Sequence, residues 1–245
     1  MGDIVLDFET ASSVDLKEVG ASVYAQHPTT EILCLVYGSQ SWDDLRVWLP
    51  GEDDAFLRHL VEDISFRFVS HGSFEQDIWR YMMVPLYGVP PLPLARWHDI
   101  MASAAWHSLP LRHEQLSKVL KNPFPKDMIG SRLTTSLSKA KKNGSYDRSA
   151  RTLASVIEYC KQDVRGEMWN HTFLGNLSAY ERRVWELDQK INQRGIKIDV
   201  PFVHAALDIV GQREQPLLKE FQDLTGGLRP AQTAKVSGPS TQPVR

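Results

Sequence analysis

The most constraining feature of the sequence is the run from Ile4 to Thr10, IVLDFET, in which an apolar stretch ends in two acids separated by one residue. Such continuous apolar residues are typical of a strand that is buried on both faces. Successive side chains of a strand point to opposite faces, so Asp7 and Glu9 should project from the same side, near the strand's C-terminal end. This pair of carboxylates suits a hard cation such as Mg²⁺ or Mn²⁺.

Two carboxylates seldom hold such an ion alone, so further acids should come from elsewhere in the chain. Glu75 lies in HGSFEQD, a sequence that indicates a tight turn and a helix start, with Asp77 as the competing acid. We expect both acids near the exposed rim of that helix. Tyr159 and Asp163 have i, i+4 spacing in a predicted helix over residues 153–174, so they should share one face. Taken singly, each motif is equally typical of ordinary surface acids.

Composition limits the classes of protein that fit. With 245 residues and 42% hydrophobic content, the chain can bury a sizeable core. Its net charge of −2 does not indicate nucleic-acid binding, so any phosphate contact must come from bound metal or from a local basic patch such as Lys139, Lys141 and Lys142. Two distant cysteines do not indicate a disulfide framework or a zinc site, and neither a signal peptide nor a membrane-length apolar run is present. We therefore expect a soluble, cytoplasmic protein with no membrane partner.

The remaining periodicity predicts a chain of alternating strands and helices. Three early strands with short connections indicate an antiparallel meander. Beyond the 153–174 helix, we expect a helix over residues 179–194, a short strand over 196–199 and a further helix from Pro201 to about Leu224. The last twenty residues have little apolar content and should be loosely ordered.

Together, the three acidic motifs resemble those of the DEDD superfamily of 3′-to-5′ exonucleases, in its tyrosine branch. The motifs here are Asp7 and Glu9 on the first strand, Glu75 after the aromatic Phe74 at a later helix start, and Y-x-x-x-D on a late helix. Three motifs in the right order are far more specific than any one alone. The resemblance is closest to the proofreading exonuclease domains of phage-type family A DNA polymerases.

The resemblance implies an α/β fold of the ribonuclease H-like type, in which a mixed sheet of antiparallel and parallel strands is flanked by helices. It implies an exonuclease domain over residues 1–176. The segment WELDQKINQRGIKID, residues 185–199, is similar to the passage from exonuclease to polymerase in such enzymes. We therefore expect a helical extension over residues 177–225 and a flexible tail over 226–245, without a polymerase active site.

The resemblance also implies a mechanism with two divalent ions, Mg²⁺ or Mn²⁺, that clamp the scissile phosphate. By the family pattern, Asp7 bridges both ions, and Glu9 and Asp163 complete the ion on the water side. Glu75 holds the other ion, and Tyr159 orients the attacking water. The implied substrate is the 3′ end of single-stranded or frayed DNA, and a separate DNA polymerase is a further expected partner.

Contacts to the terminal nucleotide are expected from Thr10 and from Phe74, the aromatic by packing on sugar or base. Two residues depart from the family pattern: His71 stands where it has Asn, and Glu75 where it has Asp. Glu keeps the charge but adds a methylene, which should shift or weaken the second ion. Two alternatives therefore stay open, an RNA exonuclease of the ribonuclease D type and a non-catalytic module that binds single strands or associates with a polymerase.

Overall fold

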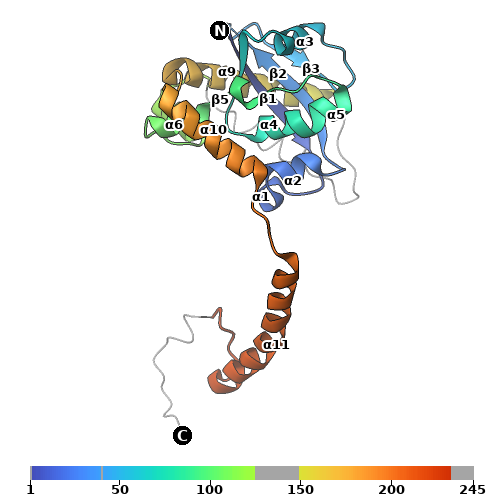
Figure 1. Ribbon diagram of the computed structural model, residues 1–245, viewed down its shortest axis with the longest axis vertical. Coiled ribbons are helices and arrows are strands. Elements are labelled where there is room, and N and C mark those ends of the chain that lie inside the picture. Colours follow the sequence, from blue (N-terminus) through green and yellow to red (C-terminus); the bar gives the residue numbers. More distant parts are fainter. Residues whose placement is uncertain (1, 40, 125–148, 233–245) are drawn as a thin grey trace. The chain divides into compact units, whose positions relative to one another are not determined.

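The computed structural model describes residues 2–39, 41–124 and 149–232, and the chain divides into two units, Met1–Lys190 and Ile191–Arg245 (Figure 1). The first unit holds all the described strands. They are β1 (Gly2–Ala11), β2 (Glu31–Gly38), β3 (Arg46–Trp48), β4 (Phe66–Ser70) and β5 (Trp97–Asp99).

These strands form one mixed sheet in the order β3-β2-β1-β4-β5. The first three strands pair antiparallel, whereas β1, β4 and β5 run parallel to one another. The predicted combination of an antiparallel meander with parallel strands is therefore confirmed. Parallel pairing arises where a helix returns the chain to the same end of the sheet, which α3 (Ala55–Glu62) does before β4.

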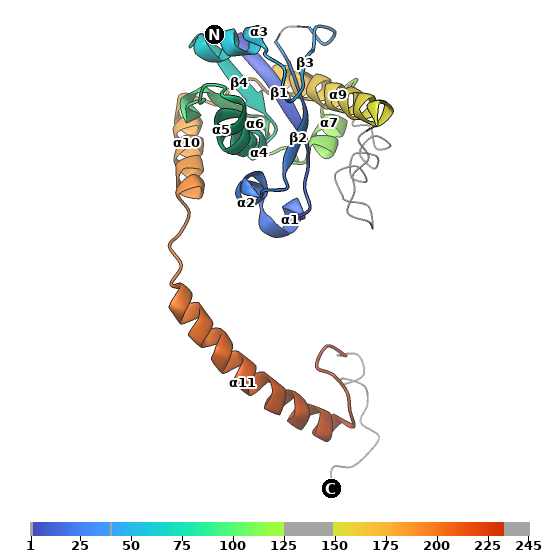
Figure 2. The same cartoon turned by 90° about the vertical axis from the view of Figure 1, so that its right-hand side faces the viewer.

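Helices cover both faces of the sheet (Figure 2). Because side chains alternate along β1, Ile4 and Leu6 pack against α3, α4 (Phe74–Ile78) and η1 (Trp79–Met83). Val5 packs on the opposite face, where the long helix α9 (Ala150–Leu174) lies with α6 (Ile100–Trp106) and α7 (His113–Val119). The result is a three-layer α/β/α unit with β1 at its centre, as expected for a strand apolar on both sides.

The segment between β1 and β2 forms two short helices, α1 (Leu16–Val19) and α2 (Ala21–Gln26). Three further elements complete the first unit: α5 (Val84–Tyr87), the 3₁₀ turn η2 (Leu94–Arg96) and most of α10 (Ala179–Arg194). The expected strand over 196–199 is wrong, because these residues adopt no regular structure. A four-residue stretch of alternating apolar and charged residues forms a strand only beside a partner strand, and all the described strands belong to the sheet of the first unit.

The second unit contains α11 (Val200–Thr225), which Asp199 caps by accepting the amide N–H of Phe202. Five of its large apolar residues follow a heptad spacing along one face, and all five are exposed: Val203, Leu207, Val210, Leu217 and Leu224. Across the described residues, no helix combines the length and the apolar character needed to cross a membrane.

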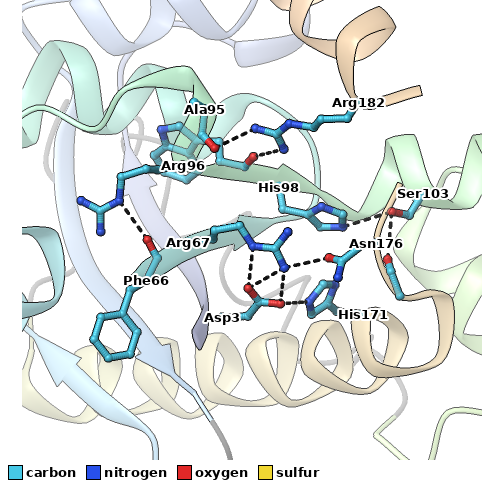
Figure 3. A network of polar contacts seen from close by, with 12 residues as sticks. Asp3, Phe66, Arg67, Ala95, Arg96, His98, Ser103, His171, Asn176 and Arg182 are labelled. Atoms are coloured by element: carbon cyan, nitrogen blue, oxygen red, sulfur yellow. Dashed lines mark hydrogen bonds and ion pairs between the residues drawn. The ribbon is translucent and has the colours of Figure 1, made fainter. Parts of the chain in front are cut away.

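A partly buried polar network holds the C-terminal end of α9 against the sheet (Figure 3). Asp3 of β1 accepts two hydrogen bonds from the guanidinium of Arg67, at 2.8 and 2.7 Å, and pairs with Nε2 of His171 in α9 at 2.8 Å. Arg67 also donates to Asn176, just beyond α9. Because α9 carries the third predicted motif, this network helps to fix that motif relative to β1.

Candidate functional site

The candidate site lies at one edge of the sheet. Strands β1, β4 and β5 run parallel, so their carboxyl ends meet at the same edge. Asp7 and Glu9 lie toward the end of β1, the turn that leads to Glu75 follows β4, and Asp99 is the last residue of β5. Four acids that are distant in the sequence are thereby brought to one region by strand topology.

Asp7 and Glu9 face α9, as the alternation along β1 predicts. Cys160 of α9 lies beside them, and the three residues offer ligand atoms that all lie within 4.8 Å of one another. The Sγ atom of Cys160 is 3.5 Å from Oδ2 of Asp7 and 3.3 Å from the Asp7 carbonyl oxygen. Both carboxylates are only half-buried, whereas the thiol is fully buried. A cation could therefore reach the carboxylates from solvent.

Glu75 is buried, with 5% of its surface exposed, so the expectation that it lies at an exposed rim is wrong. Burial raises the pKa of its carboxyl group well above the usual value, and the negative charge of Asp7 raises it further, with smaller contributions from Asp99 and Asp77. Its Oε2 atom makes no hydrogen bond with any residue that the structure describes. The charge of Asp7, from the first motif, therefore acts on the carboxyl group of Glu75, from the second motif.

Asp77, the competing acid, has different surroundings. It is half-buried, and burial raises the pKa of its carboxyl group, while the positive charge of Arg80 acts in the opposite direction. The charge of Asp7 is a main cause of the raised pKa of Glu75, whereas the charge that acts on Asp77 is that of Arg80. These contacts favour Glu75 over Asp77 as the acid that shares a cation with Asp7.

Tyr159 and Asp163 are both buried on α9, with exposed fractions of 7% and 5%. They lie one helical turn apart, and Cys160 follows Tyr159 directly on the helix. Because Cys160 touches Asp7, the turn of α9 that carries the third motif is the turn packed against the carboxylates of β1. The predicted face sharing of Tyr159 and Asp163 is thus confirmed, and both side chains point inward.

A pocket of about 350 Å³ opens beside Glu9. Thr10 and Phe74, the two predicted nucleotide contacts, both line it, together with Tyr24 and Lys17. The hydroxyl of Tyr24 is 3.1 Å from Oγ1 of Thr10, and the rings of Tyr24 and Phe74 lie 5.9 Å apart in a tilted arrangement. The pocket therefore offers one acidic wall and one aromatic wall.

One predicted patch cannot be placed in the structure, and two residues of the site were not predicted from the sequence. The predicted basic patch of Lys139, Lys141 and Lys142 lies outside the described residues. Sequence patterns did not single out Cys160 or Tyr24, because neither belongs to one of the three acidic motifs. Along the late helix, apolar residues recur every four positions at Val156, Cys160 and Val164. This spacing would have predicted that Cys160 lies on the inward face.

The residues at this edge fit a divalent cation. Hard cations bind carboxylate oxygens, and Asp7, Glu9 and Glu75 supply them within one region. A buried carboxylate that faces other carboxylates is costly unless a positive charge compensates it. Glu75 is such a group, since its Oε2 atom is buried without a hydrogen bond from the described residues. A bound cation would offset this repulsion, so these residues could hold a divalent ion.

No family profile matches the sequence. The chain is 28% identical, over 247 residues, to a DNA polymerase of Bacillus phage SP02, and the match covers 96% of this chain and 38% of that polymerase. The chain therefore spans well under half of the length of this relative, and the similarity is consistent with a polymerase-related domain.

Proposed function

We propose that this chain is a metal-dependent 3′-to-5′ exonuclease that removes nucleoside monophosphates from the 3′ end of single-stranded or frayed DNA. The observation that carries the proposal is the electrostatic contact between Asp7 on β1 and the buried Glu75 on α4, two motifs far apart in the sequence. The similarity to a phage DNA polymerase supports DNA as the substrate. It also supports a role beside a polymerase active site.

Four carboxylates would hold two divalent ions, Mg²⁺ or Mn²⁺. Asp7 would help to hold both ions, Glu9 and Asp163 would complete one, and Glu75 would hold the other. When bound, such ions acidify water and neutralise charge on a phosphate and on its leaving oxygen. Asp7 and Glu75 would otherwise repel an anionic substrate, so this neutralisation is also what allows a phosphodiester to approach.

Tyr159 would position the attacking water through its hydroxyl. Divalent ions acidify a bound water, so Tyr159 need only orient the water and not deprotonate it. The pocket beside Glu9 would receive the terminal nucleotide, with Thr10 as a hydrogen-bonding group and Phe74 as a packing surface. A terminus held there must be unpaired, which favours single-stranded or frayed ends.

The proposal is tested by digestion of matched DNA and RNA oligonucleotides. With Mg²⁺ or Mn²⁺, the purified protein should shorten a 5′-labelled single-stranded DNA stepwise from its 3′ end. Asp7→Asn should abolish shortening while DNA binding persists. Digestion of RNA but not DNA would instead support a ribonuclease D-like enzyme, and DNA binding without digestion in either metal would support a non-catalytic module.

A further inference from the structure

A buried hydrogen-bond chain leads from α10 to the turn that carries Glu75. Trp185 of α10 donates its indole N–H to Oδ2 of Asp99 at 3.3 Å. The other oxygen of this carboxylate, Oδ1, accepts the backbone N–H of Gly72 at 2.9 Å and that of Met101 at 2.8 Å. Gly72 is two residues before the start of α4, where Glu75 lies in the first turn.

The turn at Gly72 needs such support. Gly72 has φ +107°, a conformation that side-chain-bearing residues rarely adopt, and a Cβ atom there would lie 3.2 Å from the sulfur of Met101. Its carbonyl oxygen accepts the hydroxyl of Ser70 at 2.8 Å, while its N–H is bound by Asp99. The path of the chain from β4 into α4 is therefore set by two buried side chains, Ser70 and Asp99.

The partner of Asp99 is itself firmly held. Arg182, one turn before Trp185 on α10, stacks over the indole at 4.6 Å and donates to the carbonyl oxygens of Leu94, Ala95 and Trp97. Trp185 is buried, and it joins the same apolar core as Phe8 and Ile78. The indole N–H is therefore presented to Asp99 from a fixed position, which restricts rotation of the carboxylate.

We propose that Asp99 and Trp185 are positioning residues that hold the turn before α4 so that Glu75 faces Asp7. They act through Gly72 and touch no substrate. This inference rests on the proposed function, because it assigns the two residues to the placement of a metal-binding acid. It also has a purely structural content: without the indole N–H, Oδ2 of Asp99 loses a donor, the carboxylate rotates more freely, and the Gly72 N–H is held less tightly.

The test compares Trp185→Phe with Trp48→Phe. Trp48 is a matched control, since it is also buried and donates its indole N–H at 3.0 Å to the carbonyl oxygen of Glu52. It lies on β3, the outer strand on the far side of the sheet from β5. Both variants lose one buried hydrogen bond, so similar small drops in melting temperature are expected. Trp185→Phe alone should raise amide hydrogen exchange at residues 72–75, by about fivefold for a bond of ordinary strength.

The same two variants are then titrated with Mn²⁺ and assayed on single-stranded DNA. Trp185→Phe should raise the Mn²⁺ concentration for half-maximal activity by about threefold to tenfold, while Trp48→Phe leaves it unchanged. Should Trp185→Phe fail to fold, Asp99→Asn replaces it: its Oδ1 still accepts from Gly72, but its amide group opposes the indole N–H, and the same changes are expected.

The outcomes separate this inference from the proposed function. Equal exchange at residues 72–75 in both tryptophan variants would overturn the positioning role, whatever the activity. Faster exchange in Trp185→Phe, combined with a wild-type protein that neither binds Mn²⁺ nor digests DNA, would uphold the positioning role and overturn the exonuclease. Faster exchange with an unchanged Mn²⁺ requirement would show that the turn is held by Asp99 but does not place a metal ligand.

Discussion

The thiol of Cys160 in α9 lies 3.5 Å from Oδ2 of Asp7 in β1, although the two residues are 153 positions apart in the sequence. Burial raises the pKa of the Cys160 thiol well above its usual value, with further contributions from a hydrogen bond with Cys34 and from the charge of Asp7. The group is therefore a protonated thiol at neutral pH. Its small size sets how closely α9 approaches the carboxylates of the central strand.

Replacement of Cys160 should distinguish packing from chemistry. Cys160→Ser keeps a small hydrogen-bond donor beside Asp7, so Mg²⁺-dependent digestion should stay within about threefold of wild type, with a stability loss of about 1 kcal/mol from the added polarity in an apolar cluster. Cys160→Leu should displace Asp7 or α9 and reduce digestion by at least about tenfold. Loss of activity in Cys160→Ser equal to that in Cys160→Leu would indicate a direct role for the thiol.

Glu75→Gln should raise stability and abolish activity. The raised pKa of Glu75 means that the folded state disfavours its charge, so this group lowers the free energy of unfolding as pH rises above about 4.5, the usual pKa of the carboxyl. Without divalent ions, Glu75→Gln should therefore melt at a higher temperature than wild type at pH 7. Its digestion rate should fall at least about 100-fold, an effect of ~2.7 kcal/mol.

Asp77→Asn is the matched control for Glu75→Gln, since it removes a charge from the same helix. Its digestion rate should stay within about threefold of wild type, because Asp77 is only half-buried and the charge that acts on it is that of Arg80. Added Mg²⁺ should stabilise wild type and Asp77→Asn more than Glu75→Gln. A large loss in Asp77→Asn and a small one in Glu75→Gln would identify Asp77 as the ligand of the second motif.

Acid should loosen the network at the end of α9. Burial lowers the pKa of His98 from 6.5 to about 3, and the positive charges of His171 and Arg67 act in the same direction. Burial alone would raise the pKa of Asp3, but hydrogen bonds from His171 and Arg67 outweigh it and lower that pKa. Both groups therefore bind protons more readily in the unfolded chain, so stability is lost as pH falls, through His98 between about 6.5 and 3 and through Asp3 below about 3.8.

Urea denaturation at pH 7.5 and pH 5.0 measures this effect. His98 alone should lower the free energy of unfolding by about 2 kcal/mol between the two pH values. His98→Gln keeps an acceptor for Ser103, whose hydroxyl lies 3.1 Å from the imidazole, and should remove most of that decrease. An unchanged decrease in His98→Gln would assign the acid sensitivity to other groups.

The salt dependence of DNA binding tests whether the basic patch predicted from sequence contacts DNA. Simultaneous replacement of Lys139, Lys141 and Lys142 by alanine should weaken binding of single-stranded DNA and lower the salt-dependence slope by about 2. The maximal digestion rate should not change, because the lysines are not expected to touch the reacting atoms. Lys161→Ala is the control, since Lys161 already pairs with Glu158 at 2.7 Å. Equal salt-dependence slopes in both variants would exclude a role for the three lysines in binding DNA.

Much of the fold was predictable because its signals are local. The apolar run of β1 and the helical spacing of α9 each depend on neighbouring residues, and both elements form where they were expected. Asp99 caps α6 as its position before that helix predicts. The expected strand over 196–199 fails for a physical reason: strand formation requires a partner, which a local pattern does not specify.

The candidate site was predictable only in part, because its geometry depends on contacts between distant elements. The alternation along β1 predicts that Asp7 and Glu9 share a face, and helical spacing predicts the same for Tyr159 and Asp163. The burial of Glu75 was not predictable from the sequence. It arises because the carboxyl ends of the parallel strands lie together, which brings the start of α4 beside β1. The roles inferred here for Cys160 and Trp185 likewise come from contacts across the sheet and the core.

The central claim is that distant carboxylates converge to bind a pair of divalent cations. Isothermal titration calorimetry with Mn²⁺ on the wild-type protein, Asp7→Asn and Glu75→Gln tests it most directly. The account predicts about two ions per wild-type chain, about one in Glu75→Gln and near-complete loss of binding in Asp7→Asn. Absence of Mn²⁺ binding in the wild-type protein, or equal binding in all three, would contradict it.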